Sequence, residues 1–325
     1  MRTKETSEHA LCPLYPFDCN TETIELINGI RIERASDKFK EFLFEHCLEA
    51  DSFWNESSRI EKVWVASLPF PDKTFDTIMS EKQDALTSFI NILPFRTEAL
   101  AFRFVTALRL YKEGLVTPGP IVIPTFGEKE PMWFTPPWLE IRSDEYTFKE
   151  PRVFSLQIED VPAINSLFQN VYNWQAKSHL QDVYSWQTKH PENIQIALTR
   201  FHSSYGGEPE ERIIDQMIAF EAICLEGEQE LQYRLALRVA CLIGEDAETK
   251  INIFNDMRHA YKLRSKIVHG DSGVDQKELE RILPRTEEYL RKTLRKFLSL
   301  LSQHEFKQIR KQLLDQNILD SNMHL

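Results

Sequence analysis

Residues 251–270 read INIFNDMRHAYKLRSKIVHG, and this stretch decides the fold. Its apolar side chains recur every three or four residues at Ile251, Phe254, Met257 and Tyr261, and Ile267 follows six residues later. That spacing is typical of one face of a helix, and a glycine at position 270 is typical of a helix C-terminus. The stretch therefore predicts a long amphipathic helix that ends near residue 270.

The same periodicity continues on both sides of this stretch, from about residue 160 to the end of the chain. Pro162, Pro191 and Pro209 stand where helices can begin, and Gly244 stands where one can end. Short connections between successive amphipathic helices favour antiparallel neighbours. The sequence thus predicts an antiparallel helical bundle over 160–305 and a C-terminal helical tail over 306–325.

The part of the chain before residue 160 has a mixed pattern. Residues 1–20 are polar at their start and are predicted to form a flexible N-terminus. Apolar residues alternate around Asn28-Gly29, which predicts strands with a tight turn or a bulge. Ser36-Asp37 is a candidate helix start, Val63 and Val65 suggest a strand, and the residues 72–93 and 96–115 predict two further helices.

Residues 118–162 contain eight of the 16 prolines, so long helices are excluded there. Strands are predicted at 121–123 and 138–141, and the many aromatic residues argue against a linker. We therefore expect an α+β N-terminal domain over 21–159. The predicted fold class is mainly α, with this domain followed by the helical bundle.

The overall charge limits the ligands that the whole surface can attract. The chain has 325 residues, with 39 Lys+Arg against 50 Asp+Glu and a net charge of -11. Such a chain does not coat nucleic acid with its entire surface. The residues 256–269 and 276–311 are locally basic, with net charges of +3 and +5. This is consistent with solvated helix faces or with a local surface that attracts phosphate.

Several classes of protein are disfavoured by missing signals. The sequence has no glycine-rich nucleotide loop, no secretory signal, no long apolar segment and no Cys-x-x-Cys pair among its five cysteines. His202, His259 and His304 have no partners at metal-ligand spacing, and Trp133, Trp138, Trp174 and Trp186 are better explained as packing residues than as base-stacking ones. We expect a cytoplasmic chain with free thiols, no cofactor, no bound metal and no membrane partner.

The strongest chemical signal is Arg264 followed by His269 at the end of the predicted helix. An arginine is a permanently charged clamp for phosphate, and a histidine suits general acid–base work at neutral pH. On an ideal helix the two side chains lie about 140° apart. They converge only if the helix unwinds near Val268-His269-Gly270, or if a second copy of the chain completes the site.

The string Tyr-x-x-Arg-Ser-Lys-Ile-Val-His-Gly at 261–270 resembles the Apea-like branch of the HEPN domain family, which carries Arg-x4-6-His near the end of a late helix in an all-α bundle. Phe220-Glu221, Glu230, Arg238 and the Leu242-Ile243-Gly244 end of a helix fit the same pattern. The resemblance covers roughly 160–305. It implies a metal-independent endoribonuclease or RNA-targeting effector in prokaryotic defence or stress response, with Arg264 and His269 as catalytic residues. It also implies a homodimer whose motifs face each other.

Four neighbours are candidate supporting residues: Glu221, Tyr261, Ser265 and Lys266. Glu221 could orient Arg264 or lie on the surface, and Tyr261 fits the core better than the chemistry. Alternatively, Arg264 is a structural arginine paired with Glu221 or Glu230, and His269 caps the helix end. The chain would then be a non-catalytic HEPN dimerisation or interaction module that binds nucleic acid or a protein. A third interpretation from the resemblance is a nucleotide-modifying partner of a second protein.

Overall fold

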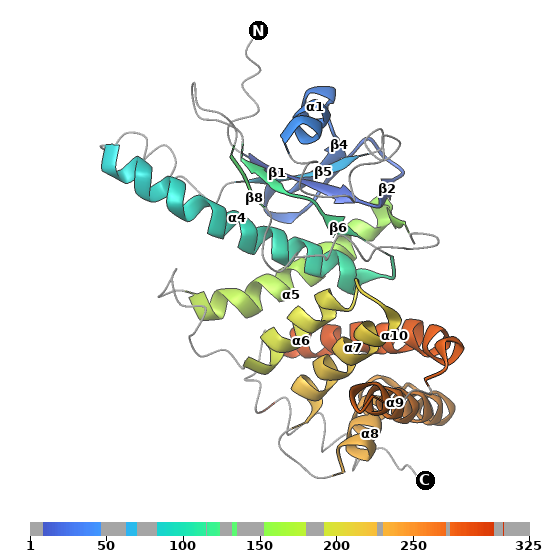
Figure 1. The fold of residues 1–325 in the computed structure, drawn as a ribbon. Helices are drawn as coiled ribbons and strands as arrows, with labels where there is room; N and C mark the ends of the chain where they lie inside the picture. The colour runs from blue at the N-terminus through green and yellow to red at the C-terminus, as the bar shows by residue number, and fades with distance from the viewer. Residues whose placement is uncertain are drawn as a thin grey trace. The chain divides into compact units, whose positions relative to one another are not determined.

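The computed structural model describes residues 9–46, 63–69, 83–114, 116–123, 132–134, 153–179, 192–225, 230–270, 274–301 and 308. The chain divides into two compact units, Met1–Phe168 and Gln169–Leu325. The division falls inside helix α5 (Val161–His179), a few residues beyond the expected boundary at 159/160. Each unit is described by itself (Figure 1).

An antiparallel sheet forms the frame of the N-terminal unit. Its strands follow the order β3-β4-β5-β1-β7-β8, and β6 also pairs with β1. The bounds are β1 (His9–Tyr15), β3 (Thr23–Glu25), β4 (Arg31–Arg34), β5 (Trp64–Pro69), β6 (Thr117–Pro118), β7 (Ile121–Ile123) and β8 (Met132–Phe134). The predicted strands around 24–32, 63–65 and 121–123 are confirmed, whereas the one at 138–141 lies outside the described residues.

The flexible N-terminus predicted for residues 1–20 is wrong for residues 9–19. These residues form β1, which pairs with β5, β6 and β7, and β2 (Phe17–Cys19). Ala10, Cys12 and Leu14 are completely buried on one face of β1. The strand places small and aliphatic residues at every second position, and this face rather than the polar start of the chain determines its structure.

The Asn28-Gly29 turn joins the two strands that the alternating pattern predicted. Ile24 pairs with Ile32, and both are completely buried. Asn28 and Gly29 have φ values of 61° and 73°, a left-handed backbone that asparagine and glycine tolerate best. The turn is held from outside by Asn165, whose Oδ1 accepts a hydrogen bond from Ile27 N at 2.9 Å.

Two helices flank the sheet in the N-terminal unit. Helix α1 (Asp37–His46) begins as predicted, because Ser36 Oγ accepts a hydrogen bond from Phe39 N at 3.2 Å, and its apolar face packs on Val65 and Val122. Figure 1 shows α4 (Gln83–Tyr111) on the other side of the sheet. The prediction of two helices at 72–93 and 96–115 is corrected, since α4 runs through Pro94 without a break. Residues 72–82 lie outside the described part.

Residues near the end of the N-terminal unit contact residues near its start. Strand β9 (Phe154–Leu156) pairs in parallel with β2, and the rings of Phe17 and Phe154 stack with centroids 5.7 Å apart. The carboxylate of Asp160 accepts hydrogen bonds from Tyr111 OH and Lys112 Nζ, each at 2.6 Å. The described end of the proline-rich region, residues 153–160, is therefore folded against other parts of the N-terminal unit.

The second unit consists of helices in the described residues. They are α6 (Glu192–Ser203), α7 (Pro209–Cys224), α8 (Leu231–Ile243), α9 (Ala247–Val268) and α10 (Gln276–Leu301). Two pairs of successive helices are in contact: Arg200 pairs with Asp215 across α6 and α7, and Gln232 Nε2 donates to Arg258 O across α8 and α9. The predicted starts near Pro191 and Pro209 are confirmed. Helix α10 starts at Gln276 and continues past Pro284.

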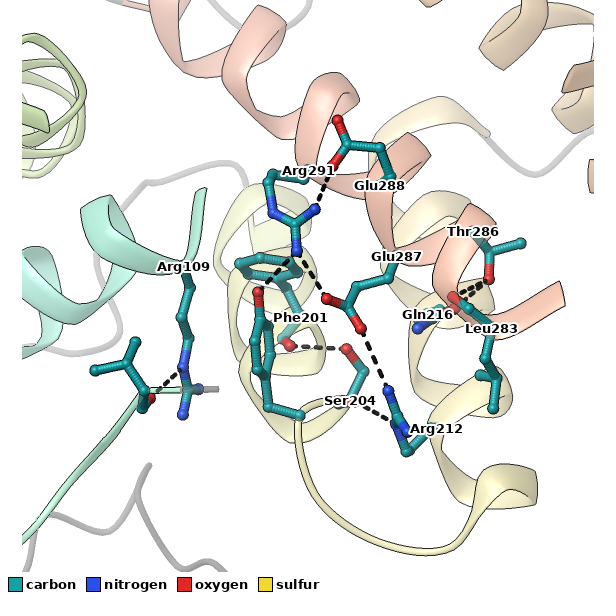
Figure 2. Close-up of polar contacts among 12 residues, drawn as sticks. Arg109, Phe201, Ser204, Arg212, Gln216, Leu283, Thr286, Glu287, Glu288 and Arg291 are labelled. Carbon is teal, nitrogen blue, oxygen red and sulfur yellow. Dashed lines mark hydrogen bonds and ion pairs between the residues drawn. The ribbon is translucent and has the colours of Figure 1, made fainter. Parts of the chain in front are cut away.

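A buried ionic network joins α10 to α7 and the turn before it (Figure 2). Arg291 is 1% exposed, and its Nη2 donates to Glu287 Oε1 at 2.7 Å and to Tyr205 OH at 3.2 Å. Glu287 Oε2 lies 3.3 Å from Arg212 Nη2, and Glu288 also pairs with Arg291. Burial lowers the pKa of Arg291, but Tyr205 and Glu287 raise it further, so the guanidinium stays charged. This network holds the bundle together.

None of the helices in the described part of the chain combines the length and the apolar character that a membrane-spanning segment needs.

Candidate functional site

Helix α9 carries both residues of the Arg-x4-His motif. It begins at Asp246, whose Oδ1 accepts a hydrogen bond from Thr249 N at 2.7 Å, and it ends with His269 as its C-cap. Gly270 follows with φ +75° and open space around its Cα, so a glycine is favoured there by backbone conformation alone. The predicted helix end at Gly270 is confirmed.

Gly244 is also at a helix end, but for another reason than the one expected. It is the C-cap of α8 with φ -79°, which any residue can adopt. A Cβ at this position would lie 2.6 Å from Ala240 O and 2.5 Å from Lys250 Cγ. Close packing between the end of α8 and the start of α9 requires the glycine there.

Arg264 and His269 do not converge within one chain. The helix stays regular through Val268, and His269 itself has φ -86° and ψ 0°, so the backbone does not unwind between the two residues. Five residues of regular helix separate the side chains by about 140°. His269 is exposed, whereas the Arg264 side chain is 25% exposed and turned toward α7.

Glu221 of α7 is the acidic partner of Arg264. Its Oε2 lies 3.7 Å from Arg264 Nη2, and the guanidinium carbon lies 5.8 Å from the centre of the Tyr261 ring. Burial raises the pKa of the Tyr261 hydroxyl, and the Glu221 carboxylate raises it further. These three residues, which we call the Arg264 cluster, come from two helices that are distant in sequence. Of the two acidic partners considered from sequence, Glu230 is instead the exposed N-cap of α8.

The Arg264 cluster keeps unused hydrogen-bonding capacity. Glu221 Oε1 and Arg264 Nε are buried, and neither has a hydrogen-bond partner within the described residues. A buried acceptor and a buried donor without partners are both unfavourable, and they often mark functional positions. The cluster thus holds Arg264 by one long ion pair and by the contact with the Tyr261 ring.

The other supporting residues have smaller roles. The carbonyl of Ser265 accepts a hydrogen bond from His269 N at 3.1 Å, which closes the last turn. Lys266 lies in that turn, where a cation is favourable beside the helix C-terminus. Arg238 of α8 is buried, and its Nη1 donates to Cys224 O at 2.7 Å. It therefore holds the C-terminal end of α7.

The exposed face of α9 carries a row of cations that ends at His269. Arg258 and Lys262 are exposed, and Lys266 is half-buried. None of them has a carboxylate within 4.0 Å among the described residues, unlike Arg200, Arg285 and Arg291 in the same unit. We call Arg258, Lys262 and Lys266 the α9 cationic row. Its four-residue spacing is visible in the sequence, since cations four residues apart share a helix face, but the net charge of the segment alone does not reveal the row.

The remaining candidates do not form a second site. His202 and Trp174 are buried, and His259 lies 3.9 Å from Glu278 across α9 and α10. The side chains of Trp133, Trp138, Trp186 and His304, and that of Cys47, lie outside the described ones. Cys12, Cys19, Cys224 and Cys241 are buried free thiols, and no group of three or more metal-ligating side chains occurs in the described ranges.

The candidate site therefore has three parts. Arg264 is partly exposed and pairs with Glu221, His269 is exposed at the end of α9, and the α9 cationic row runs from the middle of the helix toward that end. No family model, curated protein or solved structure matches this chain.

Proposed function

We propose that the helical unit is a metal-independent endoribonuclease of the HEPN type, in which Arg264 and His269 act on the RNA backbone. The observation that carries the proposal is the exposed imidazole of His269 at the end of the α9 cationic row. A row of cations attracts phosphates, and the histidine lies where a bound strand would reach the helix end.

The chemistry needs no group other than these side chains. His269 takes the proton of a ribose 2′-hydroxyl, and the 2′-oxygen attacks the adjacent phosphorus. The bond from phosphorus to the 5′-oxygen breaks, and that oxygen receives a proton from a second, protonated histidine, which is His269 of a second copy of the chain. The products are a 2′,3′-cyclic phosphate and a 5′-hydroxyl. Arg264 donates to the non-bridging phosphate oxygens as negative charge develops on them.

The 140° separation of Arg264 and His269 favours a site built from two chains. In a twofold dimer, the arginine of one protomer can face the histidine of the other, and two histidines supply a base and an acid. Large aliphatic side chains are exposed on α8 and α9, which supports an interface there: Leu231, Ile251 and Val268. The unit would thus act as a homodimer. The resemblance extends the proposal to a role in prokaryotic defence or stress response.

A second candidate function is a non-catalytic dimerisation or interaction module. It is favoured by the ion pair of Arg264 with Glu221, because this pair gives the arginine a structural role within one chain. The same exposed apolar residues would then serve an interface only. The two functions share the dimer and differ in the fate of RNA.

Incubation of the purified full-length chain with end-labelled RNA in the presence of EDTA separates them. We expect cleavage by the wild type, loss of cleavage in His269→Ala, and unchanged cleavage in His259→Ala, a histidine of the same helix that lies beside Glu278. Light scattering reports the mass of each variant in parallel. A dimer that leaves RNA intact would establish the second function, and equal cleavage by His269→Ala would refute the role of His269.

A further inference from the structure

We infer that the RNA is bound as a single strand along the exposed face of α9, with its phosphates on the α9 cationic row and one base stacked on Tyr233 of α8. This inference rests on the proposed function for the nature of the ligand. It deepens that proposal by naming the form of the RNA and the residues that bind it outside the cleavage site.

The α9 cationic row is spaced so that a nucleic-acid backbone could follow it along the helix. Arg258, Lys262 and Lys266 follow one another at four-residue intervals, which corresponds to a rise of about 6 Å per step along the helix. On an ideal helix, His269 lies within about 20° of Arg258 around the axis and about 16 Å further along it. A strand that follows the row from Arg258 therefore arrives at the histidine.

Two acidic residues near the row, Asp256 and Glu278, lie beside other side chains, so the cations of the row can bind phosphate. The acidic residue of α9 closest in sequence, Asp256, is engaged by Arg285 at 3.3 Å and by Tyr289 OH at 2.9 Å. Glu278 of α10 lies beside His259. The row thus forms a local positive surface on a chain whose net charge is -11, and this contrast directs a polyanion to α9 rather than to the whole molecule.

Tyr233 supplies an exposed aromatic ring, which the α9 cationic row itself lacks. Its side chain is 42% exposed, and its ring stands edge-on to Phe254 at 5.6 Å with an interplanar angle of 82°. The guanidinium carbon of Arg258 lies 5.5 Å from the centre of the same Phe254 ring. Phe254 therefore fixes both an exposed aromatic ring and the first cation of the row. Cations beside an exposed aromatic ring are the pattern by which proteins hold single strands.

The combination of a cationic row with an exposed aromatic ring predicts that the RNA is bound as a single strand rather than as a duplex. A base can stack on Tyr233 only if it is unpaired, because the faces of the bases in a duplex are covered by their neighbours. Three phosphate contacts on a single strand predict that log K falls with log salt with a slope of about -2. Loss of one stacking contact predicts a decrease in affinity of about tenfold.

The test measures binding without cleavage. The probe is a fluorescein-labelled 12-mer of 2′-O-methyl uridine, which has no 2′-hydroxyl to react, and the competitor is the same strand paired with its complement. Fluorescence anisotropy of the full chain is recorded between 50 and 200 mM salt. The variants are Tyr233→Ala, Tyr233→Phe, Lys262→Ala and, as a charge-matched control, Lys292→Ala, which removes an exposed lysine of α10.

We expect the single strand to bind more tightly than the duplex. Tyr233→Ala should weaken binding about tenfold with an unchanged salt slope, and Tyr233→Phe should retain it. Lys262→Ala should reduce the slope by about 0.7, while Lys292→Ala should not change it. Thermal melting of each variant confirms that the fold is intact.

Three results would overturn the inference: equal binding of duplex and single strand, wild-type affinity in Tyr233→Ala, or a Tyr233→Ala variant whose oligomeric mass changes while its RNA affinity does not. The third would assign this face to contact between copies of the chain. Failure of the proposed function gives a different result. If the chain binds the single strand in a Tyr233-dependent way but does not cleave RNA, the nuclease proposal is refuted and the inference about the binding surface stands.

Discussion

Arg264 Nη2 and Glu221 Oε2 lie 3.7 Å apart, and this contact ties the motif helix α9 to α7. Both side chains are about one-quarter exposed, with values of 25% and 24%. The pair is therefore too hydrated to dominate stability. Its consequence is positional, since it fixes which way the arginine of the motif points.

Glu221→Gln tests this positioning role. Because the carboxylate raises the pKa of the Tyr261 hydroxyl in addition to burial, its removal should lower that pKa, though not fully to that of a free tyrosine. Stability should change by less than about 1 kcal/mol. NMR titration of the tyrosine ring carbons measures the pKa, and urea unfolding measures the stability. A Tyr261 pKa that does not move would show that Glu221 does not act on this cluster.

Arg291→Met should be strongly destabilising. It leaves the Glu287 carboxylate buried with Arg212 as its remaining ion-pair partner among the described residues, and breaking a buried pair typically costs about 3–5 kcal/mol. The control is Arg200→Met, because Arg200 is 46% exposed in its pair with Asp215 and should cost less than about 1 kcal/mol. Urea unfolding of both variants gives the comparison. Equal losses would contradict the structural role of the buried network.

The two helix-end glycines should respond differently to alanine. Gly244→Ala forces a Cβ to within 2.6 Å of Ala240 O and should cost about 1–3 kcal/mol by overpacking. Gly270→Ala meets open space and should cost only the left-handed conformation, about 1–2 kcal/mol. Thermal melting should therefore rank Gly244→Ala as equally or more destabilised. A much less stable Gly270→Ala would mean that Gly270 packs against something.

The thiol of Cys12 should be unreactive in the folded protein. Burial raises its pKa from 9.0 to about 12, so the reactive thiolate is absent at pH 8. Because the folded pKa is the higher one, this group's contribution to stability is complete below pH 9 and is lost as the pH rises toward 12. Thiol titration at pH 8 with and without urea measures the first effect. Rapid labelling of Cys12 without urea would contradict its placement in β1.

Much of the local structure could be predicted because it depends on neighbours in sequence. The Ser36 cap, the turn at Asn28-Gly29 and the helix end at Gly270 each follow from a backbone requirement that one or two residues satisfy. The different directions of Arg264 and His269 also followed from helix geometry alone.

The errors arose where tertiary packing overrides local preference. β1 pairs with β5, β6 and β7, and its Ala10, Cys12 and Leu14 are completely buried. The polar residues at the start of the chain give no sign of this burial. Helix α4 continues through Pro94 although proline lacks a donor there. Glu221 and Glu230 are both candidate partners of Arg264 in the sequence, and the choice between them depends on which helices lie together. The burial of Arg291 depends on the same packing, which the sequence pattern around each residue does not encode.

The central claim is that Arg264 and His269 cleave RNA, and the single-turnover cleavage rate in EDTA tests it most directly. The wild-type chain should produce fragments that end in a 2′,3′-cyclic phosphate, identified by mass spectrometry. Loss of a general acid–base group lowers rates by about 10²–10⁴-fold, so His269→Ala should fall by at least about 100-fold while His259→Ala cleaves like the wild type. Cleavage by His269→Ala at the wild-type rate, or a wild-type chain that cleaves only when a metal ion is added, would contradict the account.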